Sequence, residues 1–149
     1  MDAIPFQYRF RVALHDIDAA GVLFFAHLFR HAHDAYESWM RALGHPLAGM
    51  LREQRIALPL VHAEADYHEP LRHGDEIEVR LEPVDVRTSR FAVRYRFING
   101  TGTQVASART VHCCIDPDSG AARTLPDALA VAIASCRVNE SATDPVARR

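Results

Sequence analysis

The fold of this chain is decided by one stretch, His15-Asp16-Ile17-Asp18-Ala19-Ala20-Gly21-Val22-Leu23-Phe24-Phe25-Ala26, and by the helix that follows it. A strand-like run ends just before this stretch. Beyond it, apolar residues recur at steps of three and four, the period of an amphipathic helix. The pattern predicts a helix of about 18 residues, stopped by Gly44 and Pro46. The apolar positions are Phe25, Leu28, Phe29, Ala32, Ala35, Tyr36, Trp39, Met40 and Leu43.

The other face of the predicted helix is polar and carries two histidines four residues apart, His27 and His31. That spacing suits a metal ion, but no glutamate follows His27 and no third ligand is evident nearby. We therefore predict a solvated or interface face, and no metal site. The polar face consists of His27, Arg30, His31, Asp34, Glu37, Ser38 and Arg41.

Alternation of apolar and polar residues predicts five strands outside this helix. Asn99-Gly100 is a strong hairpin signal between two of them. Residues 45–55 are interpreted as a loop that includes a helical turn, and Pro126 begins a short apolar helix that ends near Ser135. The predicted strands are 6–14, 61–68, 76–82, 91–97 and 103–115.

Strands joined mostly by short turns form an antiparallel sheet, and one face of that sheet needs a cover. The long helix is the candidate for that cover. The sequence therefore predicts an α+β fold in which an antiparallel sheet wraps around one central helix. We expect residues 1–136 to form a single domain and residues 137–149 to be a frayed tail.

Composition excludes several classes of function. The net charge of −2 is not that of a nucleic-acid or membrane-surface binder, and no apolar run approaches the roughly 20 residues that span a bilayer. All 17 basic residues are arginine, which excludes Schiff-base and P-loop lysines. The first residues show no secretion signal and the cysteines are odd in number, so we expect reduced thiols and a cytoplasmic location.

The pattern Asp-x-Asp-x-x-Gly-Val-x-Phe-Phe after the first strand resembles the hotdog-fold acyl-CoA thioesterases of the 4-hydroxybenzoyl-CoA type. Further segments look like the 1,4-dihydroxy-2-naphthoyl-CoA thioesterase branch, and the resemblance covers residues 6–127. It implies a hotdog fold and an enzyme that hydrolyses an aromatic acyl-CoA to the free acid and CoA without a cofactor. The implied pathway is menaquinone or phylloquinone biosynthesis. The segments are 33–39, 57–63, 74–75, 89–91 and 108–112.

The same resemblance implies a homodimer that assembles into a homotetramer. Hotdog subunits pair their sheets edge to edge and bind the ligand across the subunit contact. Catalytic groups and CoA contacts would then come from different chains. The acyl-CoA is the only other partner expected.

Asp18 is the candidate catalytic residue. It lies beside Gly21 in the loop before the helix N-terminus, where backbone N–H groups are free. Thioester hydrolysis needs a nucleophile or base, here Asp18, and N–H donors for the oxyanion, here the Phe25 amide. Asp18 either attacks the thioester or deprotonates water. The alternative is an aspartate that only caps the helix or closes a turn, which is also our interpretation of Asp16.

Candidate substrate contacts follow from the family pattern. Ala57 stands where the 4-hydroxybenzoyl-CoA enzymes have a glycine whose N–H faces the substrate carbonyl. Leu58, Pro59 and Leu60, with Phe24 and Phe25 at the helix start, suit enclosure of a flat ring. His62, on the polar face of its strand, could line the acyl pocket, orient Asp18, or be structural.

Arg87 and Arg90 flank a turn where the family's basic residues meet CoA phosphates, and arginine suits phosphate through its paired N–H donors. The alternative is a solvated turn.

Three other functions are considered. One is the hydrolysis of a different aryl- or short acyl-CoA, and another is non-catalytic acyl-CoA binding. A hotdog dehydratase would need a histidine at the helix start, which does not match. An α/β-hydrolase is excluded because Gly-x-Ser-x-Gly is absent from the sequence.

Overall fold

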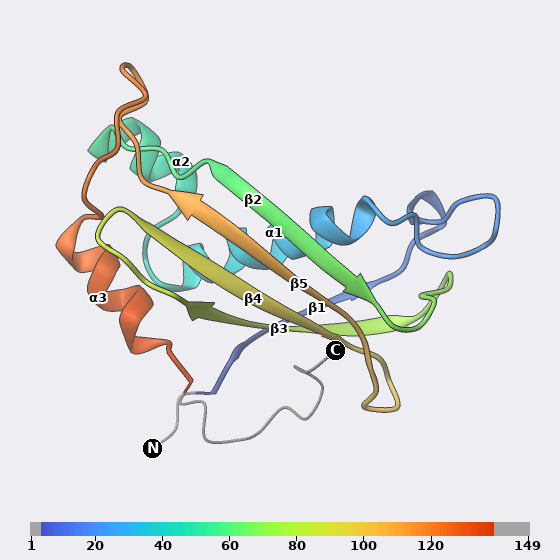
Figure 1. Cartoon of the computed structure of the whole chain (residues 1–149). Coiled ribbons are helices and arrows are strands. Elements are labelled where there is room, and N and C mark those ends of the chain that lie inside the picture. Colours follow the sequence, from blue (N-terminus) through green and yellow to red (C-terminus); the bar gives the residue numbers. More distant parts are fainter. Residues whose placement is uncertain (1–3, 139–149) are drawn as a thin grey trace.

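A computed structural model describes residues 4–138, in which a five-stranded antiparallel sheet lies against one long helix, α1 (Figure 1). The predicted tail lies largely outside these residues. No helix in the described part of the chain is long and apolar enough to cross a membrane. The elements are β1 (Phe6–Arg11), α1 (His27–Ala42), α2 (Leu47–Gly49), β2 (Leu60–Tyr67), β3 (Glu76–Val84), β4 (Arg90–Ile98), β5 (Gln104–Cys113) and α3 (Asp127–Ser135), with a 3₁₀ turn at Leu14–Asp16 and a π-helical turn at Met50–Gln54.

The strands lie in the order β1-β3-β4-β5-β2, each antiparallel to its neighbour. The expected short connections hold for β3, β4 and β5, which follow one another as hairpins. They do not hold for β2, which pairs with β5 at the far edge instead of with β3, the next strand in sequence. Turn residues indicate where a strand ends but not which strand it pairs with, so the pairing of β2 with β5 could not be predicted from the sequence.

The core lies between the sheet and the apolar face of α1. The Tyr36 ring stacks on the His112 ring of β5 with centroids 4.2 Å apart, and the Trp39 ring meets Phe91 of β4 edge-on. Such large rings dominate core energetics because each buries about 150–250 Å². The buried residues of α1 include Leu28, Ala32, Ala35, Tyr36, Trp39 and Met40, as the apolar stripe predicted.

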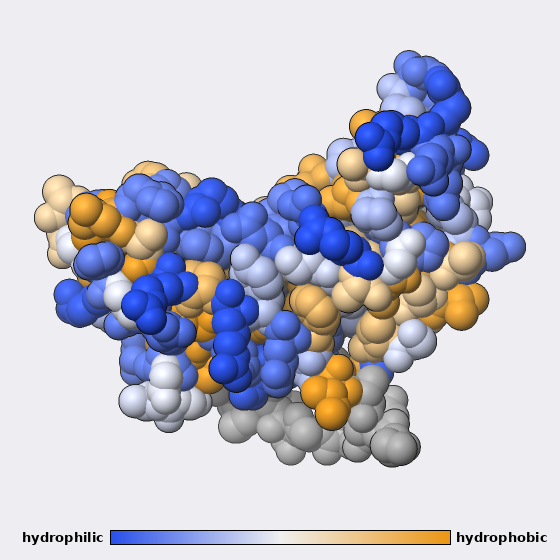
Figure 2. All heavy atoms as spheres, turned by 180° about the vertical axis from the view of Figure 1, so that it is seen from behind, coloured by the Kyte–Doolittle hydropathy of each residue, from blue (hydrophilic) through white to orange (hydrophobic). Residues whose placement is uncertain are grey.

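Phe25 departs from that stripe. The helix begins at His27, so Phe25 belongs to the preceding loop and its side chain is 62% exposed. Figure 2 shows the molecule from behind, on the side of α1, with hydrophilic side chains across the middle and hydrophobic ones toward both ends. One of these ends is the end that carries the loop before α1 (Figure 1). Exposed aromatic rings at this loop are therefore available to a partner or a ligand.

Strand β2 is the least covered part of the sheet. Of its eight residues only Ala65 is partly buried, and Leu60, Val61 and Tyr67 expose apolar surface. β5 pairs with one side of β2, whereas the other side is an edge with no neighbouring strand among residues 4–138. A long, apolar, unpaired edge is a template for pairing with another chain.

A chain of polar groups crosses the core beneath α1. The Tyr95 hydroxyl lies 3.0 Å from Thr110 Oγ1, which lies 2.9 Å from His112 Nε2. His112 Nδ1 faces the Leu58 carbonyl at 3.5 Å. A neutral His112 satisfies this chain by accepting at Nε2 and donating at Nδ1. Burial lowers the pKa of His112 to about 4, although the bond to Leu58 opposes the change.

This buried histidine predicts a loss of stability in mild acid. The unfolded chain has an ordinary histidine pKa near 6.5 and so binds the extra proton first, which means that stability falls as the pH falls from about 6.5 to 4. Between pH 7 and pH 5 we expect this group to lower the free energy of unfolding by about 2 kcal/mol. Urea titrations at both pH values, at one protein concentration, measure the loss.

The matched variant is His112→Gln, which keeps a donor and an acceptor but cannot titrate. We expect it to be less stable at pH 7 and to lose about 2 kcal/mol less than the wild type on going to pH 5. His31, whose pKa is also lowered by burial, is present in both proteins and cancels in the comparison. An equal loss in the two proteins would contradict a neutral buried His112.

Candidate active site

Residues 17–24 form a small hairpin before α1. Ile17 and Leu23 form an antiparallel bridge, and the Asp18 N–H donates to the Val22 carbonyl at 2.9 Å. Gly21 has φ +79°, a left-handed conformation that glycine adopts at little cost. Gly21 is predicted among the substrate-binding residues of the family motif, and in the structure it lets the loop turn tightly.

Asp18 lies in the tip of this hairpin and is exposed. Its Oδ1 accepts the Ala20 N–H at 2.8 Å, which is the turn-closing contact considered for this residue. Its Oδ2 has no hydrogen-bond partner within residues 4–138. The turn contact thus fixes the carboxylate and leaves one oxygen available for chemistry.

Two backbone amides at the start of α1 are also available. The N–H groups of Phe25 and Ala26 donate to no acceptor in the described part of the chain, as expected for the first turn of a helix. The Phe25 carbonyl accepts a hydrogen bond from the Tyr67 hydroxyl at the end of β2. The loop that carries Asp18 is therefore attached to the exposed edge strand.

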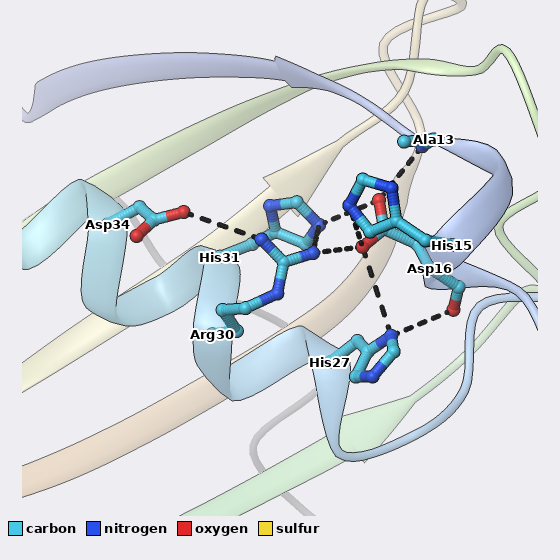
Figure 3. A network of polar contacts seen from close by, with 7 residues as sticks. All are labelled: Ala13, His15, Asp16, His27, Arg30, His31 and Asp34. Carbon is cyan, nitrogen blue, oxygen red and sulfur yellow. Dashed lines mark hydrogen bonds and ion pairs between the residues drawn. The ribbon is translucent and has the colours of Figure 1, made fainter.

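Behind the loop, the buried Asp16 carboxylate is the centre of a polar network (Figure 3). Its Oδ2 accepts the Ala13 N–H at 2.8 Å and lies 3.2 Å from His31 Nε2. Its Oδ1 pairs with the Arg30 guanidinium. The Asp16 carbonyl accepts the Phe24 N–H at 2.9 Å and lies 3.1 Å from His27 Nδ1.

This network modifies two predictions. Asp16 does cap the 3₁₀ turn through Ala13, but it is also a buried ion-pair centre. His31 is not on a solvated face: it is 5% exposed and stacks on the Phe10 ring of β1 at 3.7 Å. The spacing Leu28–His31–Ala35 places it beside the apolar stripe, a signal that its polarity obscured.

The charges in this network are balanced. Burial alone would raise the pKa of Asp16, but the Ala13 N–H, His31 and Arg30 together hold that pKa below its usual range. Burial lowers the pKa of His31 even though Asp16 opposes the change. Asp16 is therefore the anion here, and Arg30 is its principal permanent counter-charge.

Of the predicted ring-binding residues, Leu58, Pro59 and Leu60 line a cavity of about 260 Å³ near the far end of α1. Phe24 and Phe25 lie in the loop before α1 and not at this cavity. Ala57, Leu58 and Pro59 form one wall and His33 and Tyr36 of α1 form another. The loop before α1 and the helical turns after it lie at opposite ends of α1 (Figure 1). Within one chain, Asp18 therefore lies far from Leu58 and Pro59, which are predicted to hold the acyl group.

Another predicted contact, His62, lies on the exposed edge strand β2. His62 pairs with Val111 across the strands and lies 3.4 Å from Glu64, so it neither lines the cavity nor reaches Asp18 within the chain. The alternation of polar and apolar residues predicted that His62 lies on the polar face of its strand, but it could not predict where the cavity lies. His33, missed by the sequence reasoning, is the histidine that lines the cavity.

Arg87 and Arg90 lie on either side of the turn into β4. The Arg87 N–H donates to the Arg90 carbonyl, and Arg87 Nε donates to Asp85 at 2.9 Å. The hydrogen bond and charge of Arg87, together with the charges of Arg109 and Arg90, hold the pKa of Asp85 below its usual range. The turn thus concentrates positive charge around one carboxylate.

Comparison with known proteins gives a consistent family. Residues 12–133 match the model of the Thioesterase-like superfamily. A 1,4-dihydroxy-2-naphthoyl-CoA hydrolase of Synechococcus elongatus is 36% identical over 125 residues, which cover 83% of this chain and 91% of the relative.

Solved structures agree with this similarity. A 1,4-dihydroxy-2-naphthoyl-CoA thioesterase from Synechocystis has a TM-score of 0.82 at 33% identity, covering 87% of this chain and 95% of its own. A gentisyl-coenzyme A thioesterase has a TM-score of 0.76 at 26% identity, covering 86% and 98%. With the antiparallel sheet around α1, these likenesses confirm the predicted hotdog fold.

Proposed function

Because the chain belongs to the thioesterase-like superfamily, we propose that it hydrolyses the thioester of an aromatic acyl-CoA to the free acid and CoA. The similarity to 1,4-dihydroxy-2-naphthoyl-CoA hydrolases carries this proposal. It makes 1,4-dihydroxy-2-naphthoyl-CoA the first candidate substrate. The cytoplasm remains the expected location on the grounds of the sequence alone. Gentisyl-CoA, the substrate named for another structural neighbour, is also an aryl-CoA.

The proposed chemistry uses the free oxygen of Asp18 and the free amides at the start of α1. In one route Asp18 Oδ2 attacks the carbonyl carbon, the C–S bond breaks, CoA leaves as the thiolate, and water hydrolyses the mixed anhydride. In the other route Asp18 takes a proton from the water that attacks. Both routes place negative charge on the carbonyl oxygen, which the Phe25 N–H can stabilise. Neither route needs a cofactor.

We expect the complete site to require two chains. The unpaired edge of β2 can add a second copy of itself about a two-fold axis. Antiparallel pairing of two β2 strands brings the Tyr67 end of one beside the Leu60 end of the other. Tyr67 contacts Phe25 in its own chain, and Leu60 follows Pro59 of the cavity. The loop of one subunit would then face the cavity of its partner.

The exposed surface at this edge supports the same arrangement. Phe25 and Tyr67 at one end of β2, and Leu60 and Val61 at the other, are all more than two-fifths exposed in a single chain. Pairing would bury apolar side chains from both ends at once, and such burial stabilises association. We propose a homodimer formed in this way, and a homotetramer built from two such dimers.

A free-thiol assay with a panel of acyl-CoAs tests the proposed function. We expect aryl-CoAs to react faster than straight-chain ones and the dihydroxynaphthoyl thioester to be the best substrate. If a polar group of the cavity wall hydrogen-bonds a ring hydroxyl of the substrate, aryl-CoAs that lack this hydroxyl should have a kcat/KM about tenfold or more lower. His33 is now our candidate for that contact, in place of His62. Binding of an aryl-CoA with no release of thiol would contradict hydrolysis and favour a binding protein.

The two arginines at the turn into β4 are tested separately. Arg87→Ala and Arg90→Ala should raise KM by about threefold to tenfold with little change in kcat, because phosphate contacts lie far from the reacting carbon. The increase should shrink at high salt. Arg9→Ala, which removes an exposed ion-paired arginine from β1, is the matched control. A loss of kcat alone would place these arginines outside the CoA site.

A further inference from the structure

Several of the contacts that hold the hairpin of residues 17–24 in place involve Asp16. Its backbone carbonyl accepts the Phe24 N–H, which closes the base of the hairpin that carries Asp18. Its side chain binds Arg30 and His31, in the first turns of α1. One residue thus connects the arm that leads to Asp18, the arm that leads to Phe25, and the helix itself. Figure 3 shows the Asp16 side chain facing those of Arg30 and His31.

We propose that Asp16 is a positioning residue for the hydrolysis: it fixes the placement of the Asp18 carboxylate relative to the Phe25 N–H. Asp16 touches neither substrate nor reacting atoms, and it acts through the loop. The inference rests on the proposed function, because it assigns Asp18 and the Phe25 amide their roles.

The burial of Asp16 supports more than a cap. A cap needs one backbone contact at an exposed turn, whereas this carboxylate is fully buried and has an N–H donor, a guanidinium and an imidazole around it. A buried anion with these partners has one favourable orientation, because any other leaves a charge uncompensated. The depressed pKa of Asp16 is consistent with an anion throughout the neutral pH range.

Two contacts carry this orientation to the reacting groups. Asp18 follows Asp16 by two residues and its N–H is already held by Val22. Phe25 follows Phe24, whose N–H is bound to Asp16, and the His27 N–H is bound to the Phe24 carbonyl. Rotation of Asp16 would therefore move both sides of the site, and a displacement of about 1 Å can reduce a rate about a hundredfold.

The test compares steady-state kinetics of Asp16→Asn and Arg30→Gln with the wild type, using the aryl-CoA that the wild type hydrolyses fastest. Asparagine keeps the size and the acceptor for Ala13 but removes the charge. We expect kcat to fall about tenfold to a hundredfold for Asp16→Asn with KM within about threefold. Arg30→Gln should lower kcat in the same direction, and it provides the test if Asp16→Asn does not fold.

Arg41→Gln is the matched control, because Arg41 lies on the same helix in an exposed i,i+4 pair with Glu37. It should change kcat by less than about twofold. Combining Asp16→Asn with Asp18→Asn should give a loss smaller than the product of the two single losses, since residues that act as a unit are not additive. A role in stability alone would leave the kcat of the folded protein unchanged.

Amide hydrogen exchange supplies a readout that does not depend on activity. In Asp16→Asn the peptide that spans residues 17–24 should exchange at least about tenfold faster, while β4 in the core stays protected. If the wild type is active and Asp16→Asn has the same kcat and the same loop exchange as the wild type, the positioning role is wrong. A wild type that hydrolyses no acyl-CoA would instead contradict the proposed function.

Discussion

Replacing Asp18 by asparagine should lower kcat about a hundredfold or more while the protein folds normally. Asparagine Oδ1 can still accept the Ala20 N–H that holds the turn, so the loop keeps its shape. What is lost is the anionic Oδ2, the atom proposed to attack the thioester or to take a proton from water. Thiol release at saturating aryl-CoA measures the loss, and circular dichroism with thermal unfolding checks the fold.

Asp116→Asn is the matched control for this variant. Asp116 also accepts backbone N–H bonds in an exposed turn, from Asp118 and Ser119, but it lies outside the proposed site. We expect its rate to stay within about twofold of the wild type. If Asp18→Asn keeps a near wild-type rate, Asp18 only closes a turn and the catalytic proposal is wrong.

A mixture of two inactive variants should regain about a quarter of the wild-type activity. Asp18→Asn damages the loop, and Ala57→Trp fills the cavity that Ala57 lines. When the two proteins are unfolded and refolded together, random pairing makes about half of the dimers mixed. Each mixed dimer contains one site with an intact loop from one chain and an intact cavity from the other.

The control for this experiment mixes Asp18→Asn with the double variant Asp18→Asn/Ala57→Trp. No chain in that mixture has an intact loop, so no activity should return. A site built within one chain predicts that neither mixture regains activity, and that result would remove the shared site while leaving thioester hydrolysis itself untouched. Activity measured against the mixing ratio should follow the fraction of mixed dimers and be highest at an equal mixture.

The helix and strands could be predicted because their signals are local. The stripe from Leu28 to Met40 repeats with the helical period, and Asn99-Gly100 marks the β4–β5 hairpin. The position of β2 in the sheet could not be predicted, because the local sequence of a strand does not indicate which distant strand it pairs with. Its small residues Ala63 and Ala65 suit the edge position, but they fit a central strand equally well.

The candidate site was predictable only in part for a related reason. Asp18, Gly21 and Phe25 lie within one short motif, and the structure places them in one loop at the start of α1. Asp16 and His31 are fifteen residues apart and meet only because Phe10 of β1 packs against the same turn of the helix. His62 and His33 differ in which side of the sheet they occupy, and that depends on the tertiary fold.

The lengths of α1 and β2 constrain each other. The 16 residues of α1 extend about 24 Å, and the eight residues of β2 extend about 27 Å. The loop lies at one end of this common span and the cavity at the other, so two-fold pairing aligns them only while both lengths agree. An insertion of one helical turn in α1 alone would shift the loop about 5 Å along the partner's strand. Natural variation in length should therefore fall in the connections, such as residues 117–121, and spare these two elements or change them together.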